Sequence, residues 1–587
     1  MPTANKKKAG PALPRIHHPK GGAVSASAPA RKSRLVYLIS AAAAVIVVFS
    51  IYSPALHGPF VFDDNDLPYA LPSFYAPVAA WLRGPRPLLM LTYWVNNQIS
   101  GGNTFSYHVA NVLIHCLAGA FLFLILRRLL EWAGIADGRR EWFAGFGAAV
   151  FWLHPMQTEA VAYIAGRSDG LSVMLFLAAF ASFVYRRNAA VSWAEVCVLF
   201  LLFGAALLSK EQAIVLPALF LLTDYWWNPG FSFEGIRRNW KLYVPLAAGA
   251  LAGFIIFLPL LRHGGNAGFG LKDFTWYQYF FTECRALFVY PAMLLLPVGQ
   301  SADWNFAISK TIFDHGAIVG LIALVILAAL AWRHRRRYRL ASFGFFAYLL
   351  LMAPTSSIVP IKDAVAERRL YLSMMALLLI ALDFLWRWKL TRTTLAVACC
   401  AIAVALAGAT YARAGVWSSD LALWQDTVRS TPENWRAHFH LASAWYDAGR
   451  CDLAIEEYQA ATQIQKPDYD LLVDWGLAYD CANQPEAALA KLRQAAALEK
   501  TAHVYSQIGM VYGKHAQYPQ ALEALATAEK LDPNFATTYV YKGLVHLALN
   551  QPEAAVQDYQ RALALDPTYK PALSGLAQAQ GRLQQRH

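Results

Sequence analysis

Acids, cations and histidines recur in short segments that border long apolar stretches between residues 60 and 371. The acids are Asp63, Asp64, Glu159, Asp169 and Glu211, the cations are Arg86, Arg167, Lys210, Arg368 and Arg369, and the histidines are His108 and His154. A carboxylate can take the proton from a hydroxyl as that hydroxyl attacks. Fixed cations can stabilise the charge that develops on a departing phosphate. The set therefore fits transfer of a group from a phosphate carrier to a hydroxyl acceptor.

Each of these residues, taken alone, also has a purely structural interpretation. The paired aspartates can cap a helix, the Lys-Glu pair at 210–211 can form an interfacial ion pair, and the His-Pro pair at 154–155 can begin a helix. Ionisable side chains at a membrane boundary are costly to place. Their convergence on one face of the membrane would therefore favour a shared chemical role over separate structural ones.

The elements that must position these residues are strongly apolar. The chain of 587 residues is 57% hydrophobic and only 15% charged, with a mean hydropathy of +0.32. Apolar runs of about 18–20 residues cross the hydrocarbon core of a bilayer as helices, and they predict about eleven transmembrane helices here. The predicted spans are 35–53, 107–126, 142–154, 170–185, 192–208, 212–227, 242–261, 315–332, 341–354, 371–386 and 393–411.

Clusters of basic residues set the orientation of these spans. The clusters are Lys6 to Arg34 before the first span, Arg127, Arg128, Arg139 and Arg140 after the second, Arg186 and Arg187 after the fourth, Arg237, Arg238 and Lys241 after the sixth, Arg333 to Arg339 after the eighth, and Arg387, Lys389 and Arg392 after the tenth. All of them fall on one side when the spans are counted in order, which predicts a cytoplasmic N-terminus. An odd number of spans then places the C-terminal region outside. Membrane orientation also explains the net charge of +13 better than nucleic-acid binding does.

Three segments fit this topology less simply. Residues 1–34 are basic and lack an apolar pattern, so we interpret them as a disordered cytoplasmic tail before an uncleaved signal anchor, with a cleavable signal peptide as the alternative. The third span is short and ends before His154, so it can dip into the bilayer without crossing. Residues 274–297 contain Glu283, Arg285 and two prolines, and we interpret them as helices in the outer interface.

The chain becomes amphipathic after about residue 415, and a repeat begins there. Small residues at Ala442, Gly476, Gly509 and Gly543 follow one another at intervals of 34, 33 and 34 residues. This is the spacing of tetratricopeptide (TPR) repeats. We predict an all-α chain in which a transmembrane domain at 35–415 precedes a TPR α-solenoid at 416–587, with about four repeats, a half-repeat at 418–432 and a capping helix at 570–584. Docking of a protein or peptide is the favoured role of this solenoid, and a spacer or oligomerisation module is the alternative.

The seven cysteines do not form a metal-binding pattern. Five of them lie in or near apolar spans, where they pack as small hydrophobic residues. Only Cys451 and Cys481 lie in the predicted solenoid, near helix–helix turns of neighbouring repeats. Outside the cytoplasm these two can form a disulfide, and two unpaired thiols are the alternative.

Four strings carry a specific resemblance: GPRPLLMLTYWVNNQISGGNTFSYHVANVLIH, LHPMQTEAVAYIAGRSD, LLSKEQA and AERRLYLS. They closely resemble the transmembrane and TPR-containing O-mannosyltransferases, which are members of the GT-C superfamily. The resemblance covers the membrane domain almost end to end, and the TPR tail extends it to the whole chain. The chain departs from the family at Asp169, where Glu is usual. The shorter side chain changes how far the carboxylate extends more than it changes the chemistry. Its TPR array is also shorter than in many members.

The resemblance implies a GT-C fold, a polyprenyl-phosphate sugar donor, a protein hydroxyl acceptor and inversion at the sugar. It places the catalytic base at the aspartate pair, where we prefer Asp64 slightly over Asp63. Arg368 and Arg369, and then Lys210, are expected to hold the phosphate. The remaining residues of the outer face are expected to line the substrate site, and they are Arg86, His108, His154, Glu159, Arg167, Asp169, Lys210 and Glu211. No metal motif is present, and a divalent cation held by the acids is a disfavoured alternative.

The favoured function is therefore transfer of mannose or another hexose to Ser or Thr of extracytoplasmic proteins. A GT-C enzyme with a glycan or lipid acceptor is one alternative, and it would not need the TPR groove for activity. A non-catalytic membrane anchor for a TPR docking module is another, and it predicts that the outer-face charges are scattered. Short loops favour a bacterial inner membrane over the endoplasmic reticulum.

Overall fold

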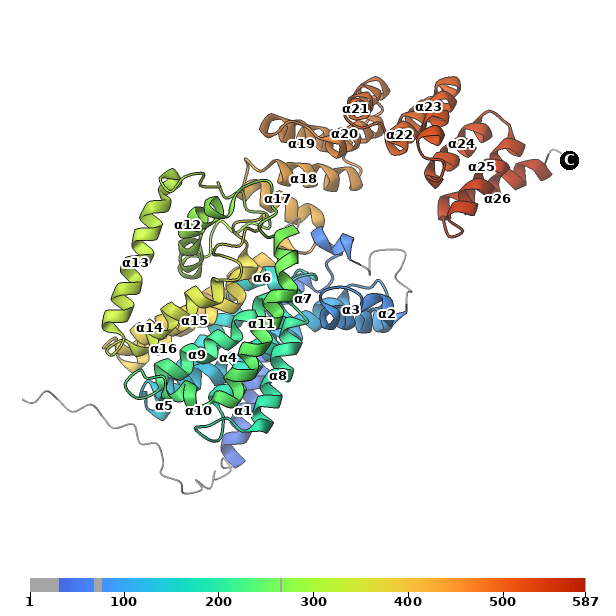
Figure 1. Ribbon diagram of the computed structural model, residues 1–587. Coiled ribbons are helices and arrows are strands. Elements are labelled where there is room, and N and C mark those ends of the chain that lie inside the picture. Colours follow the sequence, from blue (N-terminus) through green and yellow to red (C-terminus); the bar gives the residue numbers. More distant parts are fainter. Residues whose placement is uncertain (1–30, 68–76, 264–266, 586–587) are drawn as a thin grey trace, which may run out of the picture. The chain divides into compact units, whose positions relative to one another are not determined.

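The computed structural model describes residues 31–67, 77–263 and 267–585 (Figure 1). Apart from one isolated bridge between Ala267 and Ile361, the regular elements in these ranges are helices, so the chain is all-α. It divides into two compact units, one of residues 1–297 with 307–415 and one of residues 298–306 with 416–587. Most of the predicted cytoplasmic tail lies outside the described residues. Helix α1 begins at Arg31, and the boundary of the tail at residue 34 stays a prediction.

Each of the predicted spans coincides with a helix of the first unit. These helices are α1 (Arg31–Tyr52), α4 (Phe105–Trp132), α5 (Asp137–Leu153), α7 (Arg167–Val184), α8 (Trp193–Leu207), α9 (Leu216–Trp227), α11 (Trp240–His263), α13 (Ala317–His334), α14 (Arg339–Met352), α15 (Leu370–Arg387) and α16 (Arg392–Val416). Among the described residues, six stretches are long and apolar enough to cross a membrane, and α8 and α14 are shorter apolar helices. The number of crossings stays a prediction.

Three of these helices are buried so little by protein that their apolar surfaces fit contact with lipid. Only 17%, 11% and 11% of the apolar windows in Leu35–Ala55, Asp314–His334 and Arg392–Val416 are buried. Apolar surface of this extent is stable against lipid but not against water. The inner helices are tightly packed, and a Cβ at Gly344 of α14 would lie 2.6 Å from the carbonyl oxygen of Ala376 in α15. A side chain at that position would force α14 and α15 apart, so glycine permits their close approach.

Several elements of the first unit were not predicted as helices, and most of the candidate site residues lie on or beside them. They are η2 (Phe62–Asp66), α2 (Val78–Trp81), α3 (Pro87–Ser100), η4 (Pro155–Gln157), α6 (Thr158–Val161), η5 (Glu211–Val215), α10 (Glu234–Arg238) and η7 (Glu367–Arg369). Residues 274–297 contain a single helix, α12 (Trp276–Leu295), with Pro291 in its interior. The placement of α12 in the membrane interface stays a prediction.

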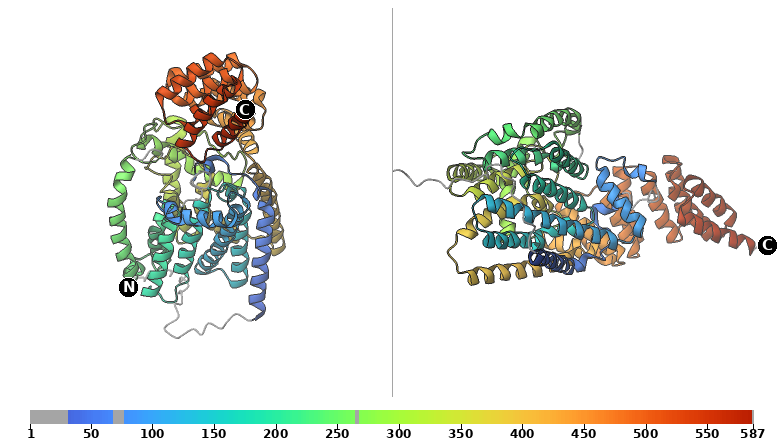
Figure 2. Two further views of the ribbon diagram at one scale, coloured as in Figure 1. Left: turned by 90° about the vertical axis from the view of Figure 1, so that its right-hand side faces the viewer. Right: turned by 90° about the horizontal axis from the view of Figure 1, so that it is seen from below.

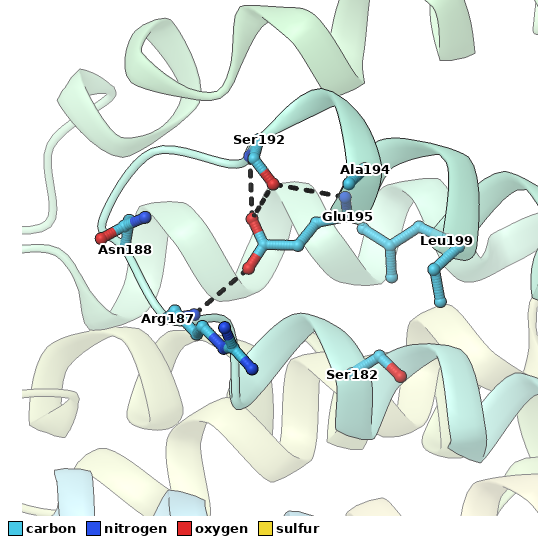
Figure 3. A pocket seen from close by; sticks show the side chains of 8 residues that line it. Ser182, Arg187, Asn188, Ser192, Ala194, Glu195 and Leu199 are labelled. Atoms are coloured by element: carbon cyan, nitrogen blue, oxygen red, sulfur yellow. Dashed lines mark hydrogen bonds between the residues drawn. The ribbon is translucent and has the colours of Figure 1, made fainter. Parts of the chain in front are cut away.

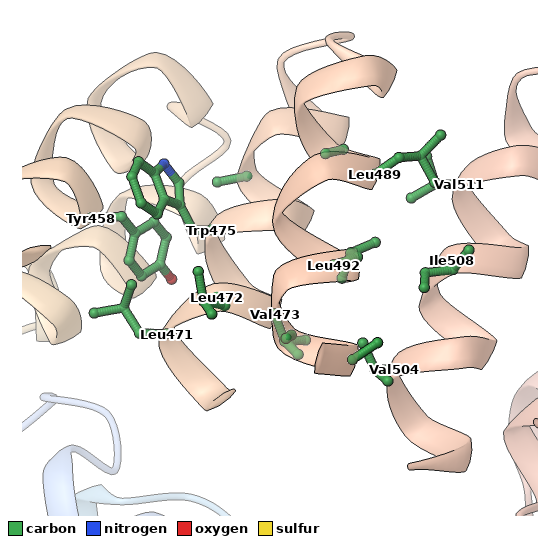
Figure 4. Packing of buried hydrophobic residues seen from close by; sticks show 14 of the residues in the cluster. Tyr458, Leu471, Leu472, Val473, Trp475, Leu489, Leu492, Val504, Ile508 and Val511 are labelled. Carbon is green, nitrogen blue, oxygen red and sulfur yellow. The ribbon is translucent and has the colours of Figure 1, made fainter. Parts of the chain in front are cut away.

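The second unit consists of paired antiparallel helices that stack in chain order (Figures 1 and 2). They are α17 (Asp420–Ser430), α18 (Trp435–Asp447), α19 (Cys451–Ile464), α20 (Tyr469–Cys481), α21 (Pro485–Leu498), α22 (Ala502–Lys514), α23 (Tyr518–Leu531), α24 (Ala536–Ala548), α25 (Pro552–Leu565) and α26 (Lys570–Gln584). Figure 4 shows the core between the pairs, where Leu472, Leu492 and Ile508 belong to one cluster of buried hydrophobic residues. The small residues of the repeat are needed here, since a Cβ at Gly509 would lie 2.5 Å from Leu525 Cγ.

Residues 298–306 also belong to the second unit, although both neighbouring segments belong to the first. Asp303 accepts a hydrogen bond from Asn434 Nδ2 at 3.0 Å, and Asn305 Nδ2 donates to the carbonyl of Glu433 at 2.9 Å. The loop after α12 is thus built into the first repeat. The chain therefore passes between the two units three times, at residues 297–298, 306–307 and 415–416.

Candidate active site

Two ion pairs join three parts of the sequence that are far apart: the α6–α7 segment, Lys210 before η5, and η7. Glu159 of α6 accepts a hydrogen bond from the backbone N–H of Arg368 at 2.7 Å, and it also pairs with the Arg368 guanidinium. Asp169 of α7 accepts from Lys210 Nζ at 2.6 Å and from Gln212 Nε2 at 3.1 Å. Both carboxylates are buried, whereas the Arg368 and Lys210 side chains remain 26% and 17% exposed. The cations are therefore the members of each pair that a ligand can reach.

The two pairs act on one another. Burial lowers the pKa of Lys210, the Asp169 carboxylate opposes this, and the positive charges of Arg368 and Arg86 add to the lowering. These groups therefore share one electrostatic neighbourhood. Four of the predicted residues, Glu159, Asp169, Lys210 and Arg368, meet there.

A third pair lies at the edge of this neighbourhood. Arg86 donates from Nε to Glu211 Oε1 at 3.0 Å and from Nη2 to Oε2 at 2.8 Å. Both side chains are open to solvent, with 36% and 51% exposure. Burial raises the pKa of Glu211, but the hydrogen bonds and charge of Arg86 outweigh this and lower it. The arrangement is a bidentate surface pair, and its geometry fixes the loop before α3 to η5.

The two neighbouring aspartates differ in their surroundings. Asp64 is fully buried, and its carboxylate accepts from the backbone N–H of Val61 at 3.1 Å and of Ala165 at 2.8 Å. It thereby pins η2 to the turn that precedes α7. Asp63 is exposed. Burial raises the pKa of the Tyr163 phenol, the charges of Asp64 and Asp63 raise it further, and the Arg368 charge opposes them.

Four other predicted site residues are enclosed by protein. The Arg167 guanidinium donates to Asn111 Oδ1 at 2.7 Å, to Asn96 Oδ1 at 2.6 Å and to the Tyr107 carbonyl at 2.8 Å. It also lies 4.5 Å from the centre of the Tyr93 ring. These contacts tie α3 and α4 to the start of α7. The expected contact of Arg167 with substrate stays untested, and its bonds are those of a scaffold.

The two histidines and Arg369 have similar surroundings. His108 Nε2 lies 3.1 Å from the Gly58 carbonyl, and His154 Nε2 lies 3.0 Å from the Leu294 carbonyl. Arg369 is 8% exposed, and it donates to the carbonyls of Ala364 and Asp363. The expected contacts of these residues with substrate or phosphate stay predictions.

Sequence analysis missed two groups beside this network. Tyr163 gave no signal beyond its place between Glu159 and the Gly-Arg pair. Glu283 of α12 was noticed only as a charge in an apolar segment. It is 1% exposed and lies 3.6 Å from Arg369, and burial raises its pKa to about 7 although the Arg369 charge opposes this. Charges in a short apolar helix were the one available clue.

The turn between α6 and α7 depends on glycine. A Cβ at Gly166 would lie 2.5 Å from the carbonyl oxygen of Glu159 and 3.0 Å from that of Tyr163. Contacts that short are repulsive, so another residue would push α7 away from α6. Gly166 therefore sets the relative position of Glu159 and Asp169.

Three comparisons with known proteins bear on this site. The family model described as Tetratricopeptide repeat matches residues 409–470 and 507–570. The human protein O-mannosyl-transferase TMTC1 is 26% identical over 65% of this chain and 48% of its own. The Caenorhabditis elegans protein O-mannosyl-transferase F38B6.6 is 25% identical over 66% and 54%, and the mouse protein O-mannosyl-transferase TMTC3 is 23% identical over 82% and 57%. The chain is a homologue of the TMTC protein O-mannosyl-transferases.

The chain spans about half the length of these curated relatives. Their matches confirm the predicted resemblance, and with the apolar helices they make this a membrane protein with TPR repeats. Among solved structures, the crystal structure of the TPR protein YrrB covers 26% of this chain and 80% of its own at 20% identity, with a TM-score of 0.23.

A cavity of about 460 Å³ lies elsewhere in the first unit (Figure 3). Its lining is Ser182, Arg187, Asn188, Ser192, Ala194, Glu195, Val198 and Leu199. Ser182 follows Asp169 by thirteen residues on the same helix, which at about 1.5 Å per residue is roughly 20 Å. The cavity is therefore separate from the ion-pair network. Within the described ranges, no three His, Cys, Asp or Glu side chains gather as a metal site would need.

Proposed function

We propose that the protein is a membrane glycosyltransferase that moves a sugar from a polyprenyl-phosphate donor to Ser or Thr hydroxyls of extracytoplasmic proteins. The observation that carries the proposal is the pairing of Arg368 with Glu159 and of Lys210 with Asp169, in which both cations stay partly exposed. Relatives named protein O-mannosyl-transferases support the sugar, which is mannose or another hexose, and the acceptor. The proposed reaction is a single displacement at the sugar.

The cations act on the leaving group. As the bond between the anomeric carbon and the phosphate oxygen breaks, its electron pair goes to the phosphate, which gains one negative charge. Arg368 and Lys210 stabilise this charge, because their partly exposed head groups are held in place by buried carboxylates. Arg369 is directed at backbone carbonyls, and in this proposal it positions η7 without touching the phosphate.

Asp63 is the better candidate for the catalytic base. Backbone N–H groups donate to both oxygens of Asp64, and such bonds make a carboxylate a weaker proton acceptor. Asp63 is exposed and acts on Tyr163 together with Arg368. The acceptor hydroxyl forms the new bond to the anomeric carbon while its proton passes to Asp63. Attack opposite the phosphate inverts the anomeric centre.

The donor lipid and the orientation belong to the same proposal. The isoprenoid chain stays in lipid, and the sugar phosphate lies at the outer interface. No step uses a divalent cation, which the acids could hold only through oxygen ligands. The N-terminus is cytoplasmic and the TPR unit is outside, in a bacterial periplasm or, as the alternative, in the endoplasmic reticulum. The Cys451–Cys481 disulfide supports this side, because disulfides persist in oxidising compartments.

The test is sugar transfer by the full chain in nanodiscs, with polyprenyl-phosphate mannose as donor and a Ser/Thr-containing protein as acceptor. Asp63→Asn should lower kcat by about 100-fold or more, because removal of a general base costs about that much. Arg368→Gln should weaken donor binding. Asp452→Asn, at an exposed acid of α19 that pairs with Arg450, is the matched control and should leave both unchanged.

Wild-type transfer by the Asp63→Asn protein would overturn the base assignment. No transfer by the wild-type chain to any protein acceptor would overturn the function. A lipid or glycan acceptor would then separate the two alternatives. The glycosyltransferase with such an acceptor predicts that it is modified, and the non-catalytic anchor predicts that it is not. The non-catalytic anchor predicts scattered charges, and the meeting of residues from three distant segments in one network counts against it.

A further inference from the structure

Helix α12 is held in place by two neighbouring helices of the first unit. Gly320 of α13 lies so close to it that a Cβ there would be 2.2 Å from the carbonyl oxygen of Cys284. Tyr348 of α14 donates from its hydroxyl to the Leu287 carbonyl at 2.6 Å. Neither contact involves η7 or α6. The position of α12 is therefore set without the elements of the ion-pair network.

The same helix contacts both segments that carry the ion pair between α6 and η7. The carbonyl oxygen of Leu294, in the last turn of α12, lies 3.0 Å from Nε2 of His154, which directly precedes η4 and α6. The hydroxyl oxygen of Tyr290 accepts from the backbone N–H of Ala366, which directly precedes η7, at 3.4 Å. One fixed helix thus contacts the segments on both sides of this pair.

A third contact between α12 and η7 is charged. Glu283 is 1% exposed, and its Oε1 lies 3.6 Å from Nη1 of Arg369. Among the residues that the structure describes, neither oxygen of the Glu283 carboxylate accepts a hydrogen bond of ordinary length. A buried carboxylate without hydrogen bonds costs free energy, so fold stability does not account for it. Its charge acts on Arg369.

Arg369 passes this interaction to the residue beside it. Its Nη1 donates to the Ala364 carbonyl at 2.7 Å, and its Nη2 donates to the Asp363 carbonyl. The guanidinium therefore fixes the loop that leads into η7. Arg368 is the next residue back along the chain, and its backbone N–H is bonded to Glu159. A shift of the Arg369 guanidinium would move this loop and with it the start of η7.

We propose that Glu283 is a positioning residue of the donor site, which holds Arg369 and through it places Arg368 for contact with the donor phosphate. Glu283 itself touches neither the donor nor the acceptor. The contact of Arg368 with phosphate rests on the proposed function, while the placement of η7 rests on the contacts of α12 alone. A buried charge on a fixed helix is suited to this role, because it cannot turn to another partner in water.

The same contact should make the placement of η7 depend on pH. Burial raises the pKa of Glu283 to about 7, although the Arg369 charge and the hydroxyls of Tyr279 and Ser356 oppose this. Above that pH the carboxylate is ionised and pairs with Arg369. Below it the carboxyl group is neutral and the charge interaction is lost. The other titratable groups on which Glu283 acts stay neutral near pH 7, and they are the phenols of Tyr279, Tyr290 and Tyr348 and the thiol of Cys284.

Hydrogen exchange of residues 363–369 in the full chain, in nanodiscs at pH 8, tests the placement directly. Glu283→Gln keeps the shape and removes the charge, and it should speed exchange there about tenfold or more, because it leaves the buried Arg369 charge unpaired. Glu234→Gln, at an acid of α10 with a 76% exposed side chain, is the matched control and should exchange as the wild type does. Wild-type exchange in the Glu283→Gln protein would overturn the proposal.

The wild-type chain supplies a measurement that needs no variant to fold. Between pH 8 and pH 6, exchange of residues 363–369 should accelerate beyond the intrinsic effect of pH, as Glu283 takes up a proton. In the Glu283→Gln protein this additional acceleration should be absent. A pH response of equal size in both proteins would assign it to another group and overturn the role of Glu283.

Binding of polyprenyl-phosphate mannose at pH 8 tests the link to the donor. Glu283→Gln should weaken it about tenfold, since a small displacement of a positioning group has effects of that order. Arg369→Gln combined with Glu283→Gln should bind as Arg369→Gln alone does, because Glu283 acts only through Arg369. Losses that multiply would overturn this route. If the wild type binds no such donor, the proposed function fails, and hydrogen exchange still decides the role of Glu283.

Discussion

Arg167 in the membrane unit is 1% exposed and donates to amide and carbonyl oxygens of two other helices, α3 and α4. Lys514 in the TPR unit has a side chain that is 52% exposed and pairs with Asp480. Both are cations on the first or last turn of a helix. The environment decides what each can do. Arg167 cannot be changed without leaving buried oxygens unpaired, and Lys514 exchanges its partner with water at small cost.

The carboxylates of the two units show the same contrast in burial. Glu159 and Asp169 are almost fully buried, so the cations that they hold are fixed before any ligand arrives. Asp447 and Asp470 of the TPR unit are exposed, so their charges are solvated and can change position at small cost. Preorganised charge suits the stabilisation of a transition state, and exposed charge suits recognition of varied segments. This contrast supports placing the proposed chemistry in the membrane unit.

The largest test of this contrast compares two arginines. Arg167→Met should destabilise the membrane unit by about 3 kcal/mol or more, because Asn96, Asn111 and the Tyr107 carbonyl each lose a charged donor. Arg450→Met removes an exposed pair with Asp452 and should leave the stability nearly unchanged. Thermal unfolding of each purified chain in detergent measures both. Equal losses of stability in the two variants would show that burial does not decide how much each arginine contributes.

The second test concerns the TPR unit's own fixed element. Cys451 and Cys481 form a disulfide with a Cα–Cα distance of 5.9 Å, so of the two alternatives left open for these thiols the bonded form is confirmed. Replacing both by Ser should cost about 3–4 kcal/mol in local stability, since the bond closes a loop of 30 residues. Hydrogen exchange of α19 and α20 in the full chain measures the loss. Cys197→Ser, at an exposed free thiol of α8, should have no effect there.

The two units also differ in how far the sequence predicts them. Residues that recur every 33 or 34 positions place each TPR helix, because every repeat solves the same packing problem. Apolar length places the membrane helices equally well, since lipid enforces it. Neither rule reaches α3, whose apolar and polar residues mix, nor the loop 298–306, whose contacts with Asn434 and Glu433 join residues about 130 positions apart.

The sequence groups the residues of the candidate site, but it does not assign a role to each of them. The sequence placed Glu159, Asp169, Lys210 and Arg368 on one face, and the structure pairs them. It could not tell Asp63 from Asp64, because neighbours in a loop differ only in the contacts that the fold makes. Nor could it assign Arg167 to the scaffold, since that depends on Asn96 and Asn111 of two other helices. Tertiary partners decide whether a charged residue is buried for structure or held for chemistry.

A smaller effect is expected at the turn that sets the ion pairs. Gly166→Ala places a Cβ 2.5 Å from the Glu159 carbonyl, and shifting α7 to relieve this should cost about 1–3 kcal/mol. Sugar transfer should fall as well, because Asp169 and Glu159 move apart. Gly145→Ala in α5, where a Cβ meets nothing within 4 Å, should be neutral or slightly stabilising. If both variants behave alike, close packing at Gly166 does not position the site.

The smallest effect concerns a turn that the repeats build with different residues. The turn between the paired helices contains a left-handed residue in each full repeat: Gly449, Asn483, Ala516 and Asn550, with φ of 73°, 58°, 59° and 59°. Alanine is the one least suited to this conformation, since its Cβ crowds the following carbonyl at a cost of about 1–2 kcal/mol.

Ala516→Gly removes this strain but adds freedom to the unfolded chain, so the net gain should be about 0.5–1 kcal/mol. Gly449→Ala introduces the same strain two repeats earlier and should lower the stability by about the same amount. Hydrogen exchange of α22 and α23 for the first variant, and of α18 and α19 for the second, measures each locally in the full chain. A stabilised Gly449→Ala protein, or a destabilised Ala516→Gly protein, would mean that contacts of the turn outweigh its backbone strain.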